Sequence, residues 1–139
     1  MASIPFEIIV ISAQDLEKVR KFFNMEVHAR VFLGTTPEKR TPTDRHGGTN
    51  PAWNHTMNYT ISETMVHNSN NNLVIKLYCT RMMGDKYIGE VSISMKELFH
   101  TAYARGGTAA LRLPLLKGSA NSQGGLTFSF KFGDRVINV

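Results

Sequence analysis

Large and polar side chains alternate along most of this chain, with the period of two that is typical of a β-strand. The clearest stretch is 53–61, where Trp53, Met57 and Tyr59 share one face and Asn and Thr side chains occupy the other. Two glycines and a proline in Gly47-Gly48-Thr49-Asn50-Pro51 predict a shaped loop that leads into it. With weaker segments included, the pattern predicts strands at 6–12, 25–33, 38–43, 53–61, 73–79, 87–94, 109–115 and 126–132.

One helix interrupts this series. Ser94-Met95-Lys96-Glu97 matches a capping box, with Ser94 at the N-cap and Glu97 three residues later, and the helix should run to about Tyr103. Short strands with even turn punctuation favour an antiparallel sandwich over a parallel sheet. We therefore predict an all-β fold: a sandwich of about eight strands in a single domain, 1–139, with a short helix between strands six and seven.

Composition and charge limit the kinds of partner and cellular compartment that fit this chain, but they do not select one function. The net charge of +5 favours an anionic partner, which a membrane, an acidic protein or a nucleic acid would satisfy equally. A single cysteine, Cys79, excludes an intramolecular disulfide and fits a reducing compartment. The N-terminal segment lacks the features of a signal peptide, and no apolar stretch approaches the length of a membrane span.

Three motifs, in this order and spacing, resemble those of C2 domains, β-sandwich modules that often bind phospholipid with or without calcium. They are Ile9-Val10-Ile11-Ser12-Ala13-Gln14-Asp15-Leu16, Gly48-Thr49-Asn50-Pro51-Ala52-Trp53-Asn54 and Asp85-Lys86-Tyr87-Ile88-Gly89-Glu90. The final Gly124-Gly125-Leu126-Thr127-Phe128-Ser129-Phe130 is similar to the strand that opens other C2 domains. Its position at the end of the chain implies the circularly permuted, type II Greek-key topology. The ensemble is similar to the small single-C2-domain plant proteins induced by cold, elicitors and other stress.

The resemblance implies a calcium site of aspartates in the first and third loops, and this chain departs from it. The third-loop positions fall on Cys79, Arg81 and Lys86, and Asp85 lies one residue away from the last. Calcium needs six to eight oxygen ligands, which basic residues do not supply. We therefore expect no metal or other cofactor; the weak candidates for residual calcium binding are Glu26, Asp44 and Asp85.

The same resemblance places three loops, 18–24, 44–51 and 80–86, together at one end of the sandwich. Basic groups surrounding apolar side chains suit an anionic membrane surface. The expected lipid-binding residues are Lys18, Arg20, Lys21, Phe22, Phe23, Arg45, Arg81, Met82, Met83 and Lys86. The alternative is that the Phe and Met pairs fold back as core and the charges are ordinary surface. A second basic group, Arg30, Lys39 and Arg40, falls near the family's phosphoinositide site, unless it is simply a solvated face.

Other classes of function have less support. No nucleophile–base arrangement, metal-ligand spacing or phosphate-binding glycine motif points to an enzyme. The single predicted helix carries few basic residues, which argues against a nucleic-acid partner. We expect a cytoplasmic module that associates peripherally with the plasma membrane or an endomembrane in stress or defence signalling. The alternatives are an adaptor that binds a signalling or membrane protein, and a degenerate calcium-dependent lipid-binding domain.

Overall fold

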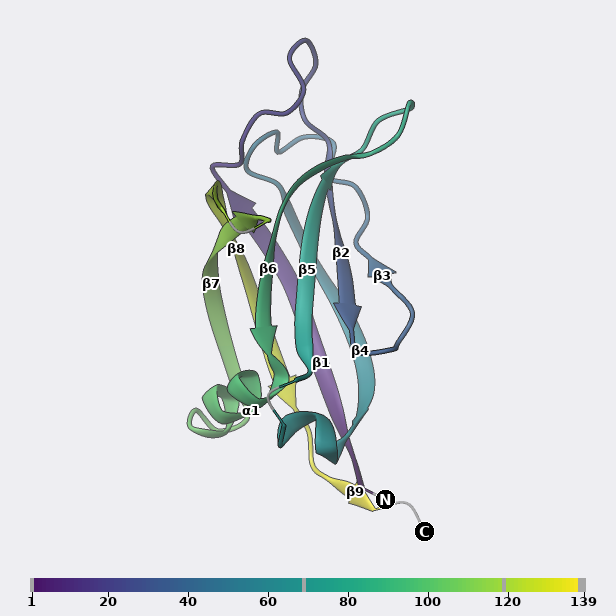
Figure 1. Ribbon diagram of the computed structural model, residues 1–139, viewed down its shortest axis with the longest axis vertical. Helices are drawn as coiled ribbons and strands as arrows, with labels where there is room; N and C mark the ends of the chain where they lie inside the picture. Colours follow the sequence, from purple (N-terminus) through teal and green to yellow (C-terminus); the bar gives the residue numbers. More distant parts are fainter. Residues whose placement is uncertain (1, 69, 119, 138–139) are drawn as a thin grey trace.

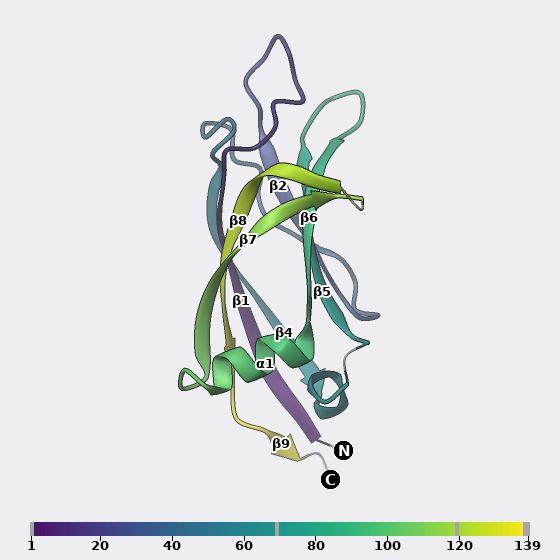
Figure 2. The ribbon, with the colours of Figure 1, turned by 60° about the vertical axis from the view of Figure 1, so that its left-hand side comes forward.

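Two layers of antiparallel strands enclose the core of this protein (Figures 1 and 2). The computed structural model describes residues 2–68, 70–118 and 120–137. One layer has the order β3 (Lys39–Arg40), β2 (Val27–Leu33), β5 (Asn72–Cys79) and β6 (Lys86–Ser94). The other has the order β7 (Thr108–Lys117), β8 (Ala120–Phe132), β1 (Ala2–Gln14) and β4 (Ala52–Ser62). The layers are continuous where β6 pairs with β7 at Glu90 and Leu116.

The core lies between the layers and follows the alternation seen in the sequence. Phe6, Ile8 and Val10 of β1 are buried, while Glu7 between Phe6 and Ile8 is only half-buried. The large side chains of β5 and β8 are buried in the same way. Trp53 ties the layers together, because its indole Nε1 donates a hydrogen bond across the sandwich to the carbonyl oxygen of Val27, at 2.9 Å.

The predicted fold class is confirmed. The strands pair in antiparallel fashion, and helix α1 (Met95–Tyr103) lies between β6 and β7. The Ser94 hydroxyl accepts a hydrogen bond from the backbone N–H of Glu97 at 3.1 Å, as the capping box predicts. The last long strand, β8, pairs with the first, β1, which is the arrangement expected of the permuted topology.

The boundaries of several elements differ from the prediction. The segment between the expected strands 109–115 and 126–132 is largely a hairpin rather than a loose turn, because β7 continues to Lys117 and β8 begins at Ala120. The expected strand at 38–43 shrinks to two residues, and β2 begins at Val27 rather than Met25. A short 3₁₀ helix, η1 (Glu63–Val66), lies between the expected strands 53–61 and 73–79, where no helix was predicted. The described residues also form a ninth strand, β9 (Val136–Ile137), which pairs with the start of β1.

Candidate functional site

Three loops meet at one end of the sandwich, at the top of Figure 1. The first loop, 15–26, follows β1; the second, 41–51, precedes β4; the third, 80–85, connects β5 to β6. Backbone hydrogen bonds join them: the N–H of Leu16 donates to the oxygen of Thr49 at 3.0 Å, and that of Thr80 to the oxygen of Glu26 at 2.7 Å. Buried Leu16 and Met25 anchor the two ends of the first loop in the core.

Asp44 shapes the second loop. Its carboxylate accepts hydrogen bonds from the backbone N–H groups of His46, Gly47 and Ala52, at 2.8, 3.1 and 2.7 Å. Burial alone would raise the pKa of this carboxyl, but the three amides outweigh that effect and hold it below its usual value. Gly48 takes a φ of +61°, which glycine adopts without strain. Asp44 is therefore a structural residue of the loop, with few oxygen lone pairs left for a metal.

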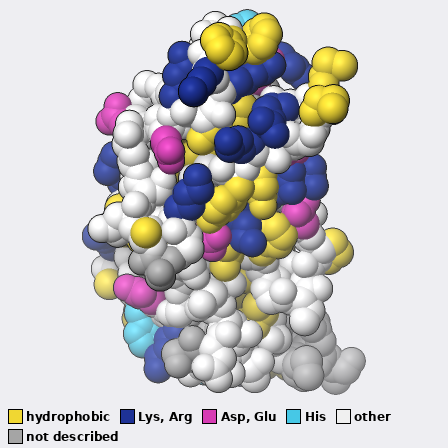
Figure 3. Space-filling view, turned by 45° about the horizontal axis from the view of Figure 1, so that its top comes forward, with side chains coloured by type: hydrophobic (Ala, Val, Ile, Leu, Met, Phe, Trp, Pro, Cys, Tyr) yellow, Lys and Arg dark blue, Asp and Glu magenta, His cyan; other side chains and the backbone are white. Residues whose placement is uncertain are grey.

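The apolar side chains of the first and third loops project into solvent. Phe22 is 90% and Phe23 65% exposed, and Met82 and Met83 are almost completely exposed. The alternative that they fold back as core is therefore wrong. In Figure 3, where this end is turned toward the viewer, hydrophobic side chains stand out from a surface rich in Lys and Arg. Phe23 also contacts a charge directly, since the Arg20 guanidinium lies 4.7 Å from the centroid of its ring.

The predicted basic residues surround these apolar side chains. Arg20 is half-buried, and the others are exposed on or beside the same three loops: Lys18, Lys21, Arg45, Arg81 and Lys86. Arg81 is held along the third loop, because its Nε donates to the carbonyl oxygen of Gly84 at 2.9 Å. The structure thus brings together all ten residues predicted for the loop end.

The carboxylates of Glu26 and Asp85, the other two candidate calcium ligands, are already paired with arginines. Glu26 receives Nη1 of Arg45 on one oxygen at 2.8 Å and Nη1 of Arg20 on the other at 3.4 Å. The hydrogen bond from Arg45 is the main reason that the pKa of Glu26 lies below its ordinary value. Asp85 is bound by Nη2 of Arg30 at 2.6 Å. Within the described ranges, no group of three or more His, Cys, Asp or Glu side chains is arranged to hold a metal ion.

The second predicted basic group does not form one patch. Arg30 and Arg40 are direct partners across β2 and β3, but Arg40 forms an ion pair with Glu38. Lys39 faces the other layer, where its ammonium lies 4.2 Å from the centroid of the Tyr59 ring. Adjacent residues of a strand point to opposite faces, so a run of two basic residues divides between them.

Sequence reasoning missed the aromatic and basic neighbours of Arg30. The Arg30 guanidinium stacks 3.7 Å from the centroid of the Tyr78 ring, and Lys76 is its direct partner on β5. The alternation within 73–79 already indicated that Lys76 and Tyr78 share the outer face of the strand. The basic part of this face therefore consists of Arg30, Arg40 and Lys76.

His28 links this face to the third loop. Its ring is buried; Nε2 accepts a hydrogen bond from Nε of Arg30 at 3.1 Å, and Nδ1 lies 2.7 Å from the Thr80 hydroxyl. A ring whose Nε2 accepts must carry its proton on Nδ1, so Nδ1 donates to Thr80. Burial lowers the pKa of His28 below 6.5, although the Asp85 carboxylate acts in the opposite sense. The geometry thus requires neutral His28.

We expect His28 to make stability depend on pH. A lowered folded-state pKa means that the stabilisation is complete above the unfolded-state pKa, about 6.5, and is lost as the pH falls through the folded-state value. The free-energy difference between the wild type and His28→Asn, which lacks the titrating ring, should shrink between pH 7.5 and pH 5. Urea denaturation at several pH values measures it. A difference that stays constant with pH would contradict the assignment.

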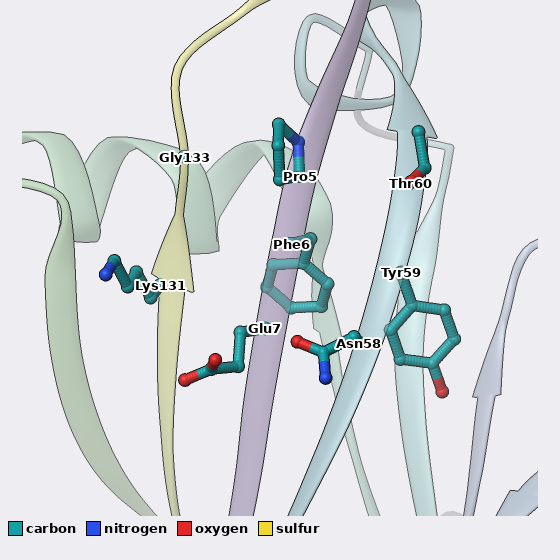
Figure 4. Close-up of a pocket in the computed structure, with 8 residues that line it drawn as sticks. All are labelled: Pro5, Phe6, Glu7, Asn58, Tyr59, Thr60, Lys131 and Gly133. Atoms are coloured by element: carbon teal, nitrogen blue, oxygen red, sulfur yellow. The ribbon is translucent and has the colours of Figure 1, made fainter.

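A separate hollow lies on the side of the sandwich, away from the loops (Figure 4). It has a volume of about 450 Å³ and is lined by β1, β4, Lys131 and Gly133. Its two charged side chains, Glu7 and Lys131, have opposite charges and are direct partners across β1 and β8. Burial raises the pKa of Tyr59, beside this hollow, to about 12, so the phenol stays neutral. This hollow shows no charge preference comparable with that of the loop end.

Comparison with known proteins identifies the family. The family model of the C2 domain matches residues 5–109. The chain belongs to the C2 domain family. It is 32% identical over 134 residues to Protein SRC2 of Glycine max, and 32% identical over 135 residues to the Protein SRC2 homolog of Arabidopsis thaliana. These alignments cover 94% and 93% of the chain but 46% and 40% of those proteins, so this C2 domain spans less than half the length of each.

Solved structures support the same C2 fold. The C2A domain of plant Extended Synaptotagmin 1 superposes with a TM-score of 0.75 at 18% identity, covering 93% of both chains. A C2 domain-containing protein from a putative elicitor-responsive gene gives a TM-score of 0.68 at 20% identity, over 91% of this chain and 86% of the other. Together with the SRC2 matches, which carry the relationship to plant proteins, these structures confirm the predicted resemblance to plant C2-domain proteins. No helix in the described part of this C2 domain is long and apolar enough to cross a membrane.

Proposed function

We propose that this C2 domain is a non-catalytic module that binds anionic phospholipid membranes peripherally and without calcium, through its three loops. The observation that carries the proposal is the exposure of Phe22, Phe23, Met82 and Met83 within a ring of basic side chains. Soluble domains rarely expose neighbouring large apolar side chains unless a partner or a membrane covers them. The surrounding positive charge favours an anionic membrane as that partner.

The expected energies are sufficient for reversible binding. Each Lys or Arg near an anionic surface contributes about 1 kcal/mol. Each apolar side chain that leaves water contributes about 1.5–3 kcal/mol when it is completely buried. Three groups of each kind contribute about 7–12 kcal/mol at most, against a cost of about 4 kcal/mol or more for the freedom lost on binding, so the expected binding is weak and reversible.

Arginines support the calcium-independent part of the proposal. A calcium ion at the loop end would need Glu26 and Asp85 as ligands, and both are already bound by guanidinium groups. Replacing those contacts would leave Arg20, Arg30 and Arg45 beside a divalent cation, with unfavourable repulsion. The loops therefore use fixed arginine charges where a calcium-binding C2 domain would use the metal.

The proposed setting follows from the relatives. The SRC2 relatives come from the plants Glycine max and Arabidopsis thaliana, and the description of one similar solved structure names a putative elicitor-responsive gene. We extend this to a role in stress or defence signalling, at the cytoplasmic side of the plasma membrane or an endomembrane. A protein-interaction module is the competing function. The groove around Phe99 and exposed Tyr103, at the opposite end of the sandwich, would be a suitable surface for it.

Vesicle co-sedimentation tests the proposal. The protein is mixed with phosphatidylcholine vesicles with or without phosphatidylserine, in calcium or in chelator, at low and high salt. We expect binding that requires the anionic lipid, ignores calcium and weakens with salt. Binding only in calcium would instead favour the degenerate calcium site, and the absence of binding in every condition would favour the protein-interaction module.

A further inference from the structure

A hollow opens at the centre of the loop end, between all three loops. Its volume is about 450 Å³, and it is lined by Arg20, Glu26, Arg45, Thr80, Arg81 and Met82. The first loop supplies two of these residues, the second loop one and the third loop three. Three guanidinium groups and one carboxylate give the lining a formal charge of +2. A concave surface with this charge suits an anion better than a metal.

Most of the hydrogen-bond donors in this hollow have no protein acceptor among the described residues. Arg45 donates to Glu26 through Nη1 alone, and Arg20 uses only its Nη1, toward Glu26 and the oxygen of Asn24. Arg81 uses only Nε, toward Gly84. A guanidinium has five N–H donors, so each of the three arginines retains at least three. Glu26 acts as a positioning residue, because it fixes two of the guanidinium groups on opposite sides of one carboxylate.

We propose that this hollow binds one phosphate group of an anionic lipid headgroup, with Arg20, Arg45 and Arg81 as its ligands. The planar fork of a guanidinium matches two oxygens of a phosphate, and several forks around one tetrahedral group satisfy the remaining oxygens. A phosphomonoester carries more charge than a phosphodiester at neutral pH and offers more free oxygens, so it is the preferred ligand. This inference rests on the proposed membrane function and adds a discrete site to it.

The apolar side chains point to a lipid as the source of the phosphate. Met82 lines the hollow and is also almost completely exposed, and Phe23 contacts Arg20. Apolar side chains that enter the lipid at the rim would bring the hollow to the level of the headgroups. A phosphate bound there would therefore be part of the membrane surface, and a soluble phosphate ester would lack the apolar contribution.

Two substitutions that each remove one positive charge distinguish a discrete phosphate site from diffuse electrostatic attraction to the membrane. Arg45→Gln removes a lining residue of the hollow, and Lys21→Gln removes an exposed charge of the first loop that does not line it. Vesicles contain either phosphatidylinositol 4-phosphate or phosphatidylglycerol, matched for total charge. Diffuse attraction predicts a loss of about fivefold for either variant on either lipid. The phosphate site predicts that Arg45→Gln loses about tenfold more on the phosphomonoester lipid than on phosphatidylglycerol, while Lys21→Gln shows no such difference.

Equal losses for the two variants on both lipids would overturn the site and leave the proposed membrane function intact. A soluble arm covers the case in which the wild type binds no vesicles. Inositol 1,4-bisphosphate is then titrated into the labelled protein, and the amide NMR signals of Glu26 and Arg81 are followed. Shifts that Arg45→Gln abolishes would support the phosphate site without the membrane, and the absence of shifts would overturn it.

Discussion

Replacing Phe22, Phe23, Met82 and Met83 together with alanine is expected to weaken binding to anionic vesicles by about a thousandfold. If each side chain enters only the headgroup region, it contributes about 1 kcal/mol, less than the value for complete burial. Four such contributions amount to about 4 kcal/mol, or about three orders of magnitude. The four side chains are largely exposed in the folded protein, so the free energy of unfolding should change by no more than about 0.5 kcal/mol. Co-sedimentation and chemical denaturation measure the two quantities.

Tyr103→Ala is the matched control for this prediction. Tyr103 is a large side chain with 79% exposure, but it lies on α1, at the opposite end of the sandwich (Figure 1). Its loss should leave vesicle binding unchanged. If the quadruple variant kept its affinity, or if Tyr103→Ala weakened binding equally, the three loops would not be the membrane contact. The protein-interaction module would then be the better explanation of the exposed apolar side chains.

Gly124→Ala is expected to destabilise the fold by about 3 kcal/mol or more. Gly124 has a φ of +93°, and a Cβ there would lie 2.4 Å from the oxygen of Gln14 and 2.8 Å from that of Asp15. These backbone atoms mark the end of β1 and the start of the first loop. The substitution must therefore separate β8 from β1 and displace that loop. Chemical denaturation should show the loss of stability, and vesicle binding should weaken with it.

Gly118→Ala is the control that separates backbone strain from the steric clash at Gly124. Gly118 also has a positive φ, +66°, but, its chain neighbours aside, no atom of the described residues lies within 4 Å of the position of an added Cβ. This substitution carries backbone strain without a clash and should destabilise by about 1 kcal/mol. The difference between the variants then measures the close approach of β8 to the end of β1. Equal losses of stability would mean that the clash at Gly124 is relieved by a shift of the backbone.

The strands that were predicted correctly are those in which hydrophobic and polar side chains alternate, because the hydrophobic side chains form the buried face. Residues 53–61, 73–79 and 126–132 all became strands, because a one-residue shift would move their large side chains out of the core. The start of β8 was missed since its polar, glycine-containing stretch has no alternation, and it forms a strand by pairing with β7. The two-residue β9 depends in the same way on β1, which is distant in the sequence.

The loop residues were easier to predict than the contacts among them. A string of basic and apolar residues in three loops was enough to place the candidate surface. No pattern, however, shows that Asp85 binds Arg30, which is 55 positions away, or that Glu26 lies between two arginines. Such pairs depend on which strands and loops become neighbours in the folded chain. For the same reason Lys39, grouped with Arg40 by proximity in the sequence, turned out to face Tyr59.

The pairing of Ala2 with Ile137 places the two ends of the described chain side by side, at the end of the sandwich opposite the three loops (Figure 1). β1, with 13 residues, runs most of the way between these ends of the molecule, a distance of about 40 Å at about 3.3 Å per residue. If the loops rest on a bilayer, the domain is a rigid spacer. Any polypeptide or fluorescent tag joined to either terminus would be held about 40 Å above the lipid, clear of the contact surface.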